Sequence, residues 1–249
     1  MMIPVFAIGC AVLGAVLASF AGVIAERMHT GESFAHGRSR CNSCNRTLTA
    51  RDLVPVVSWV VSKGRCRTCM ARIPYGYTLS EATLALLFFM SALVIPVAHL
   101  PYFLAALFFL AIVVLYDLRH TIVPLPPTYL LIAASVLFAY VSAPDFHALM
   151  SVFLTACCIA LGFFFMHVLS KGRWMGLGDT PVAFALSLLA APYAVAGLLF
   201  SFWIGAVIGI GILVATPKGH RMGIEVPFIP FLAAGYLLAF FTQWNPLPF

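Results

Sequence analysis

The chain has 249 residues, of which 63% are hydrophobic and 9% are charged. Soluble globular proteins carry about 25% charged residues, so this composition excludes an ordinary soluble globule. The mean hydropathy of +1.04 predicts that most of the chain crosses a membrane. The formal net charge of +6 does not indicate nucleic-acid binding, because basic residues beside membrane spans are expected to have anionic lipid headgroups as partners.

Apolar runs bounded by charged residues, Pro or Gly predict about eight transmembrane helices. The runs are 3–25, 79–98, 101–116, 125–143, 147–169, 179–191, 193–215 and 227–243. The run at 179–191 is shorter than the roughly 20 residues that span a bilayer, which predicts a short sheltered helix or a re-entrant segment. The expected fold class is therefore an all-α polytopic membrane protein.

The basic residues predict the orientation, because cytoplasmic loops hold the excess of Lys and Arg. Nine of the 14 lie in the stretch 26–78, and the rest follow the third, fifth and seventh runs. Those are Arg119, Lys171, Arg173, Lys218 and Arg221. With the N-terminus outside, every one falls on the cytoplasmic side. The first run has no basic residue before it, which predicts a retained anchor rather than a cleaved signal peptide.

Four cysteines in the polar stretch form two Cys-x-x-Cys pairs that are 21 residues apart. They are Cys41, Cys44, Cys66 and Cys69. This spacing is typical of a structural zinc site with four thiolate ligands. Cytoplasmic thiols stay reduced, so a disulfide or a redox pair is the weaker interpretation. Metal binding would also supply folding free energy to a loop too small to stabilise itself. Cys10, Cys157 and Cys158 lie in apolar runs and are expected to be buried.

Two acids lie at membrane boundaries next to long apolar runs, Asp117 in LYDLRHTIVP and Asp179 in MGLGDTPVAF. An ionisable group at such a position is costly and indicates function. Each also has a structural interpretation: Asp117 can mark a helix end, and Asp179 can cap a helix that starts near Pro181. Both fall on the same predicted side. Gly176 and Gly178 allow close backbone approach and otherwise costly torsion angles.

A close pair of carboxyl groups predicts peptide hydrolysis. The two groups cannot both ionise easily, so one is held protonated and the other charged, as in aspartic proteases, where the pair activates water and protonates the reacting carbonyl. Such a pair titrates as a unit. The sequence therefore does not assign the acid and the base separately.

Several motifs together resemble the bacterial type IV prepilin peptidases, which are GxGD aspartic proteases. These are the four-cysteine loop with Gly64-Arg65-Cys66-Arg67-x-x-Cys69, Ser19-Phe20, Tyr77-x-x-x-Glu81, Asp117 followed by Ile122-Val123-Pro124, Gly176-Leu177-Gly178-Asp179, and the PFxPFLA segment at 227–233. The resemblance extends over nearly the whole chain.

The resemblance implies a multi-pass enzyme of the bacterial inner membrane with Asp117 and Asp179 as catalytic residues at the cytoplasmic face. It would remove the leader from type IV prepilins or type II secretion pseudopilins and N-methylate the new N-terminal residue with S-adenosylmethionine. The domains would be a first transmembrane helix at 1–25, a cytoplasmic zinc-binding loop at 26–78 and a peptidase domain at 79–249.

Two other classes of membrane protein are compatible with parts of this pattern. A protease of the presenilin or signal-peptide-peptidase type shares the Tyr116-Asp117 and GLGD motifs, but its pattern has no four-cysteine loop. A proton or cation transporter with a regulatory zinc loop would place its acids nearer the bilayer midplane and often shows paired broken helices. Pro181 and Leu125 depart from the prepilin peptidase pattern, which commonly has Lys and an acid there.

Overall fold

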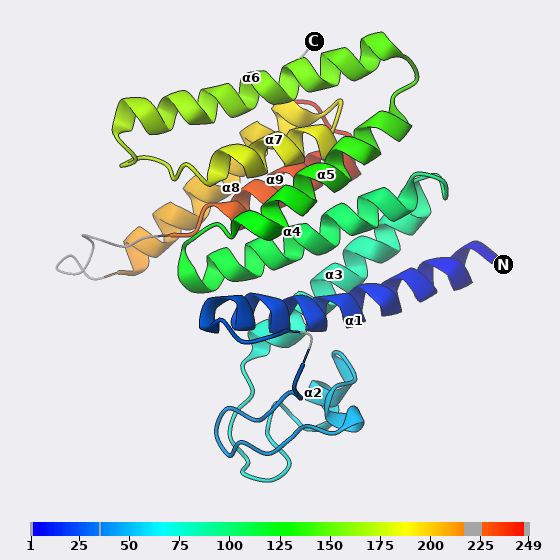
Figure 1. The fold of residues 1–249 in the computed structure, drawn as a ribbon, viewed down its shortest axis with the longest axis vertical. Helices are drawn as coiled ribbons and strands as arrows, with labels where there is room; N and C mark the ends of the chain where they lie inside the picture. Colours follow the sequence, from blue (N-terminus) through cyan, green and yellow to red (C-terminus); the bar gives the residue numbers. More distant parts are fainter. Residues whose placement is uncertain (1, 35, 217–225, 247–249) are drawn as a thin grey trace. The chain divides into compact units, whose positions relative to one another are not determined.

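The computed structural model describes residues 2–34, 36–216 and 226–246, and within them it is helical apart from isolated β-bridges (Figure 1). The long helices are α1 (Met2–Thr30), α3 (Tyr75–Val94), α4 (Leu100–His120), α5 (Leu125–Ser142), α6 (Phe146–Ser170), α7 (Asp179–Leu189), α8 (Ala194–Ala215) and α9 (Ile229–Thr242). Each predicted apolar run is thus a helix. In the described part, six of them are long and apolar enough to cross a membrane, whereas α7 and α9 are shorter. The prediction of an all-α polytopic membrane protein is confirmed.

The chain divides into two compact units, Met1–Leu100 and Pro101–Phe249. The first contains α1, α3 and the loop between them, in which η1 (Ala50–Asp52) and α2 (Val57–Val61) form. The second contains α4 to α9. Lys218 and Arg221, two of the basic residues that predict the orientation, lie outside the described residues.

Small residues let α1 and α3 pack closely in the first unit. The buried positions of α1 are mostly small residues and are Ala7, Cys10, Gly14, Ala18, Ala21, Gly22, Ile24 and Ala25. A Cβ on Gly14 would lie 2.7 Å from the carbonyl oxygen of Leu84 and 2.9 Å from the Phe88 ring. The glycine is therefore needed for space, as expected where membrane helices associate through small residues.

The short helix α7 lies at the centre of the second unit, packed against α5, α6, α8 and α9 (Figure 1). Seven of its 11 residues are buried apolar or Ser side chains in the run Val182–Leu189, and Asp179 is buried as well. Eleven residues extend only about 16 Å, roughly half of the hydrocarbon thickness. Of the two alternatives for this run, the structure favours a short helix sheltered by protein.

Helices α8 and α9 approach each other through glycine and serine. A Cβ on Gly197 would lie 2.8 Å from the Tyr236 ring, and a Cβ on Gly235 would collide with the backbone of Ser201. Ser201 Oγ donates to the carbonyl oxygen of Leu232 on α9 at 3.1 Å. The start of α9 is thereby held against α8, which fixes the position of the segment that contacts the acids described below.

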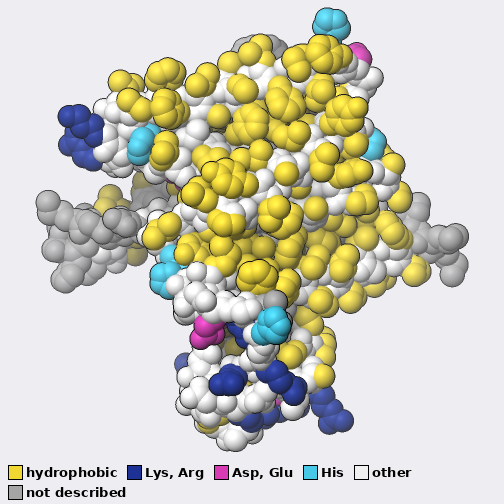
Figure 2. All heavy atoms as spheres, viewed as in Figure 1, with side chains coloured by type: hydrophobic (Ala, Val, Ile, Leu, Met, Phe, Trp, Pro, Cys, Tyr) yellow, Lys and Arg dark blue, Asp and Glu magenta, His cyan; other side chains and the backbone are white. Residues whose placement is uncertain are grey.

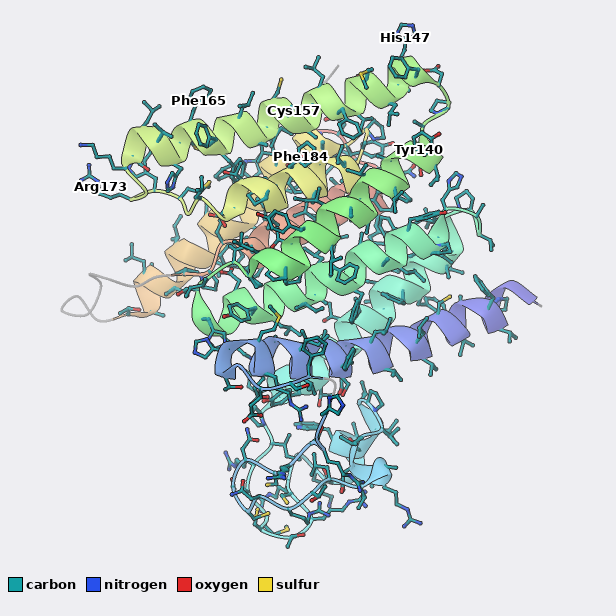
Figure 3. The ribbon with its side chains drawn as sticks, in the orientation of Figure 1. Tyr140, His147, Cys157, Phe165, Arg173 and Phe184 are labelled. Atoms are coloured by element: carbon teal, nitrogen blue, oxygen red, sulfur yellow. The ribbon has the colours of Figure 1, made fainter. Side chains whose placement is uncertain are left out.

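Hydrophobic side chains cover the visible faces of the helices (Figure 2). Cys157 on α6 (Figure 3) belongs to this surface, and both Cys157 and Cys158 are exposed. The prediction that these two cysteines are buried is wrong, because α6 turns this face away from the protein; Cys10 is buried as predicted.

Candidate functional site

The structure brings Asp117 and Asp179 together from different helices. Asp117 lies in the last turn of α4, and Asp179 is the first residue of α7. Their side chains are largely inaccessible, with residue exposures of 4% and 7%. The charge of Asp117 acts directly on the carboxyl group of Asp179. Two of the predicted site residues therefore form one buried acidic pair within the second unit.

Backbone N–H groups from two further segments contact the pair. Asp117 Oδ2 accepts a hydrogen bond of 3.3 Å from the N–H of Ile229, and the carboxyl group of Asp179 is hydrogen-bonded by the backbone of Gly176. Ile229 is the first residue of α9, where N–H groups lack helical partners and carry partial positive charge. The beginning of α9 is thus part of the site. The PFxPFLA motif pointed to this segment, but its residue pattern assigned Ile229 no role.

The structural interpretation of Asp179 as a helix cap does not hold. The N-cap of α7 is Gly178, so Asp179 lies inside the first turn instead of capping it. Asp117 lies in the last turn of α4, which ends at His120, so Asp117 is also a helix-end residue, as its structural interpretation predicts. Next to the pair, Thr180 Oγ1 is buried and has no hydrogen-bond partner among the described residues. A buried hydroxyl without a partner is costly, which makes it a candidate donor to a bound substrate.

Gly178 is required for space. Its φ of −65° and ψ of −22° are ordinary helical values, so the expectation of unusual torsion angles is wrong here. A Cβ at this position would lie 2.5 Å from Val123 Cγ2 and 2.6 Å from Val123 Cβ. Val123 belongs to the turn that follows the helix of Asp117. The two motif segments that carry the acids therefore approach closely, as predicted for the glycines.

The four cysteines of the loop also come together. Their Sγ atoms all lie within 4.8 Å of one another, and the Sγ atoms of Cys41 and Cys69 are 3.8 Å apart. Four sulfurs at about 2.3 Å from a tetrahedral zinc ion are separated by about 3.8 Å, whereas a disulfide needs about 2.05 Å. The cluster can hold a metal ion, and all four thiols are free.

Each Cys-x-x-Cys pair lies in a hairpin of the same construction. Cys41 N–H donates to Arg46 O and Cys66 N–H donates to Ala71 O, both at 2.9 Å. The residue after the second cysteine has positive φ in both hairpins, 55° at Asn45 and 58° at Met70. The stretches 39–48 and 64–73 are thus a short repeat, which an alignment of SRCNSCNRTL with GRCRTCMARI would have revealed.

Backbone groups in these hairpins favour the thiolate form. The N–H groups of Cys69 and Thr68 lower the pKa of the Cys66 thiol to about 6. Those of Cys44 and Ser43 likewise lower the pKa of Cys41. The thiolate is the form that binds metal, so the local fold prepares Cys41 and Cys66 for ligation, whereas desolvation and the neighbouring thiols raise the pKa of Cys69 to about 11.

Asp52 joins the two hairpins. Its carboxylate pairs with Arg46 of the first hairpin at 3.1 Å and with Arg67 of the second at 3.4 Å. Thr49 donates to it from its N–H at 3.0 Å and from its hydroxyl at 2.8 Å. The Thr49 N–H is the main cause that lowers the pKa of Asp52. Sequence spacing alone gave no signal for this residue.

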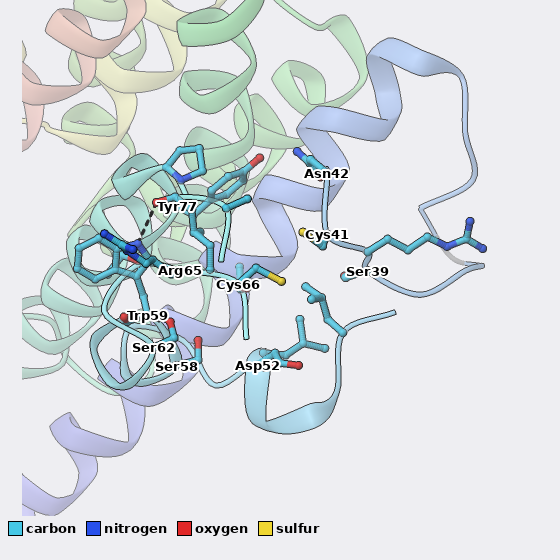
Figure 4. A pocket seen from close by; sticks show the side chains of 18 of the residues that line it. Ser39, Cys41, Asn42, Asp52, Ser58, Trp59, Ser62, Arg65, Cys66 and Tyr77 are labelled. Carbon is cyan, nitrogen blue, oxygen red and sulfur yellow. Dashed lines mark hydrogen bonds between the residues drawn. The ribbon is translucent and has the colours of Figure 1, made fainter. Parts of the chain in front are cut away.

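A pocket of about 240 Å³ lies between the loop and the adjoining ends of α1 and α3 (Figure 4). Its lining includes Glu26, Trp59, Arg65, Tyr77 and Glu81. Within it, the Trp59 ring occupies the space beside Gly64, and its Nε1 donates to Ile73 O at 3.2 Å. The pocket therefore combines carboxylates, a guanidinium group and aromatic rings on a firmly packed frame.

Comparisons with known proteins identify the family of this chain. The bacterial peptidase A24 N-terminal domain matches residues 12–95, and the type IV leader peptidase family matches residues 104–214. A prepilin leader peptidase/N-methyltransferase of Aeromonas salmonicida (strain A449) is 31% identical over 83% of this chain and 74% of the relative. The chain belongs to the type IV leader peptidase family. The family predicted from the sequence motifs is thereby confirmed.

Other relatives carry the same name. The protein of Bacillus subtilis (strain 168) is 28% identical over 92% of this chain and 91% of its own length. That of Myxococcus xanthus (strain DK1622) is 31% identical over 86% of this chain, which spans 65% of that relative. No solved structure gives a significant match.

The glycines of the GxGD motif provide a matched pair of substitutions. Gly178→Ala forces the Val123 turn to move, and overpacking of this kind costs about 1–3 kcal/mol. Gly176→Ala brings its Cβ no closer than 3.6 Å to Asp179 Oδ2, an ordinary contact. We expect Gly178→Ala to lower the thermal unfolding temperature of the detergent-purified protein and Gly176→Ala to leave it nearly unchanged. Equal effects of the two would contradict the packing of Gly178 on Val123.

Proposed function

We propose that this protein is a membrane aspartic endopeptidase that removes the leader of type IV prepilins or type II secretion pseudopilins. The observation that carries the proposal is the buried pair of Asp117 and Asp179, joined to the N-terminus of α9 through Ile229. The names of the relatives support the substrate class.

The proposed reaction uses the two carboxyl groups as one unit. The charged carboxylate takes a proton from a water molecule, which attacks the carbonyl carbon of the scissile peptide. The protonated carboxyl group gives its proton to the carbonyl oxygen. Transfer of a proton to the departing amine then breaks the C–N bond. Backbone N–H groups at the start of α9 favour negative charge on Asp117.

The position of the acids supports a peptidase over a transporter. Asp117 is in the last turn of α4 and Asp179 is the first residue of α7, whereas transport sites lie near the bilayer midplane in broken helices. The tetracysteine cluster and the relatives' names favour a prepilin peptidase over a protease of the presenilin type.

We expect Asp117→Asn and Asp179→Asn each to reduce leader cleavage by about 10²- to 10⁴-fold, because Asn retains the shape and removes the titrating oxygen. Asp145→Asn is the matched control: Asp145 caps α6 by accepting from Ala148 N–H at 2.7 Å, and Asn caps equally well. Each variant is coexpressed with a prepilin, and intact mass reports loss of the leader. Cleavage at the wild-type rate in either variant of the pair would rule out the aspartic mechanism.

For the tetracysteine loop, we propose a structural zinc site formed by Cys41, Cys44, Cys66 and Cys69. The donor set and the sulfur separations fit a closed tetrahedral site. Such a site leaves no open position for water or substrate, so the metal would order the loop and take no part in hydrolysis.

Replacing Cys41 or Cys69 by Ser is expected to lower bound zinc from about one equivalent per chain and to make residues 36–74 sensitive to added protease. Cys157→Ser is the control, because Cys157 is exposed on α6 and outside the cluster. Zinc is measured by mass spectrometry of the reduced protein. A reduced wild-type protein without zinc, or cysteine variants as resistant as the parent, would contradict the assignment.

We further propose that the protein N-methylates the new N-terminal residue with S-adenosylmethionine, as the relatives' names suggest. The described residues contain no strand followed by a glycine-rich nucleotide loop. The pocket next to the tetracysteine loop nevertheless has groups that fit this cofactor: Glu26 and Glu81 for hydroxyl or amino groups, Arg65 for a carboxylate, and Trp59 for a base. The cofactor would supply the methyl group, and these side chains would bind and orient it.

We place the protein in the bacterial inner membrane with the acid pair and the tetracysteine loop on the cytoplasmic side. The distribution of Lys and Arg supports this orientation. A periplasm-active reporter inserted after Pro144, between α5 and α6, is expected to be active, and the same reporter inserted after Ala50 is expected to be silent. The opposite pattern would reverse the orientation.

A further inference from the structure

The short helix α2 has one polar and one apolar side. Ser58 and Trp59 line the pocket beside the tetracysteine loop. Val57, Val60 and Val61 lie at helical spacing on the other side, with exposures of 56%, 60% and 66%. Leu53 and Val54, just before the helix, are exposed too, and Leu53 also borders the pocket. We call these five exposed side chains the valine face.

The valine face is unusual for a surface in contact with water. The solvent side of a helix in a soluble domain is normally polar, and β-branched residues are not favoured in helices for their own sake. A contiguous apolar patch on a loop rich in arginine therefore indicates an apolar environment.

A hydrogen bond places this segment beside a candidate membrane span. The N–H of Val56 donates to Glu81 Oε2 at 2.7 Å. Glu81 is six residues into α3, about 9 Å along its axis, and α3 is long and apolar enough to cross a membrane. Val56 has a φ of 61°, which is costly for a β-branched residue. The valine face therefore starts beside α3, near the first residues of that candidate span.

The charged residues around the valine face fit a position at a membrane surface. The exposed basic residues Arg51 and Lys63 flank the segment, where they can meet anionic headgroups. In Figure 2, the loop shows some hydrophobic side chains close to the apolar surface of the helices, and Lys and Arg side chains are spread over the loop.

We propose that the valine face is an interfacial anchor that inserts into the headgroup and acyl boundary of an anionic bilayer and holds the tetracysteine loop against the membrane. Its binding energy comes from burial of the valine side chains and from attraction of Arg51 and Lys63 to the lipid, as in other interfacial amphipathic segments. The proposal depends on the membrane location of the protein and is independent of its peptidase activity.

Photo-crosslinking of the full-length protein in nanodiscs tests the anchor. The photoreactive residue p-benzoylphenylalanine replaces Val60, or Met70 as the control, because the two native side chains are apolar, lie in the same loop and have matching exposures of 60% and 58%. Bound metal is measured in both variants to verify the loop fold. In nanodiscs that contain phosphatidylglycerol, we expect about tenfold more lipid adduct at position 60 than at position 70 by intact mass.

Two further measurements decide whether lipid or protein covers the valine face. Arg51→Gln combined with Lys63→Gln is expected to reduce the lipid adduct at position 60, as is replacing phosphatidylglycerol by phosphatidylcholine. An adduct with polypeptide at position 60 would show that a protein surface covers the valine face and would overturn the proposal. Equal lipid yields at positions 60 and 70, or no adduct at position 60, would overturn it as well. Prepilin cleavage is measured on the same nanodiscs, so a failure of the proposed peptidase is distinguished from a failure of the anchor.

Discussion

The arrangement of the second unit depends on the partners of two buried acids. A carboxyl group in an apolar bundle is costly unless it is hydrogen-bonded, and the N–H of Ile229 supplies that bond for Asp117. This contact joins the end of α4 to the start of α9, while Asp179 joins the start of α7 to the same place. Three helix ends must therefore converge, and a buried pair of carboxyl groups is the consequence.

Close packing through small residues makes this convergence possible. Gly178 leaves room for Val123 between the two acid-bearing segments, and Gly235 leaves room for Ser201 between α8 and α9. Helices in lipid gain little from the hydrophobic effect when they associate, so they depend on such close contacts. The same principle operates separately in the first unit, where Gly14 contacts α3.

The tetracysteine loop obeys a different constraint, because it has no large apolar core. Two similar hairpins bring four sulfurs together, and Asp52 connects them through Arg46 and Arg67. The bond from Val56 to Glu81 then attaches the loop to α3. Ion pairs and a metal site can hold a small loop where burial of apolar surface is insufficient.

The sequence by itself determined the helices, the two acids as candidate catalytic residues and the cysteine cluster. Each of these depends on local composition or spacing. Apolar runs predict helices, and two Cys-x-x-Cys pairs predict a metal site. The tertiary structure alone decided that α7 is sheltered, that Asp179 is not a helix cap, that Ile229 contacts Asp117, and that α6 exposes Cys157. These features arise from contacts between residues up to 112 positions apart. Periodicity describes one helix at a time and holds no information about which neighbour covers which face.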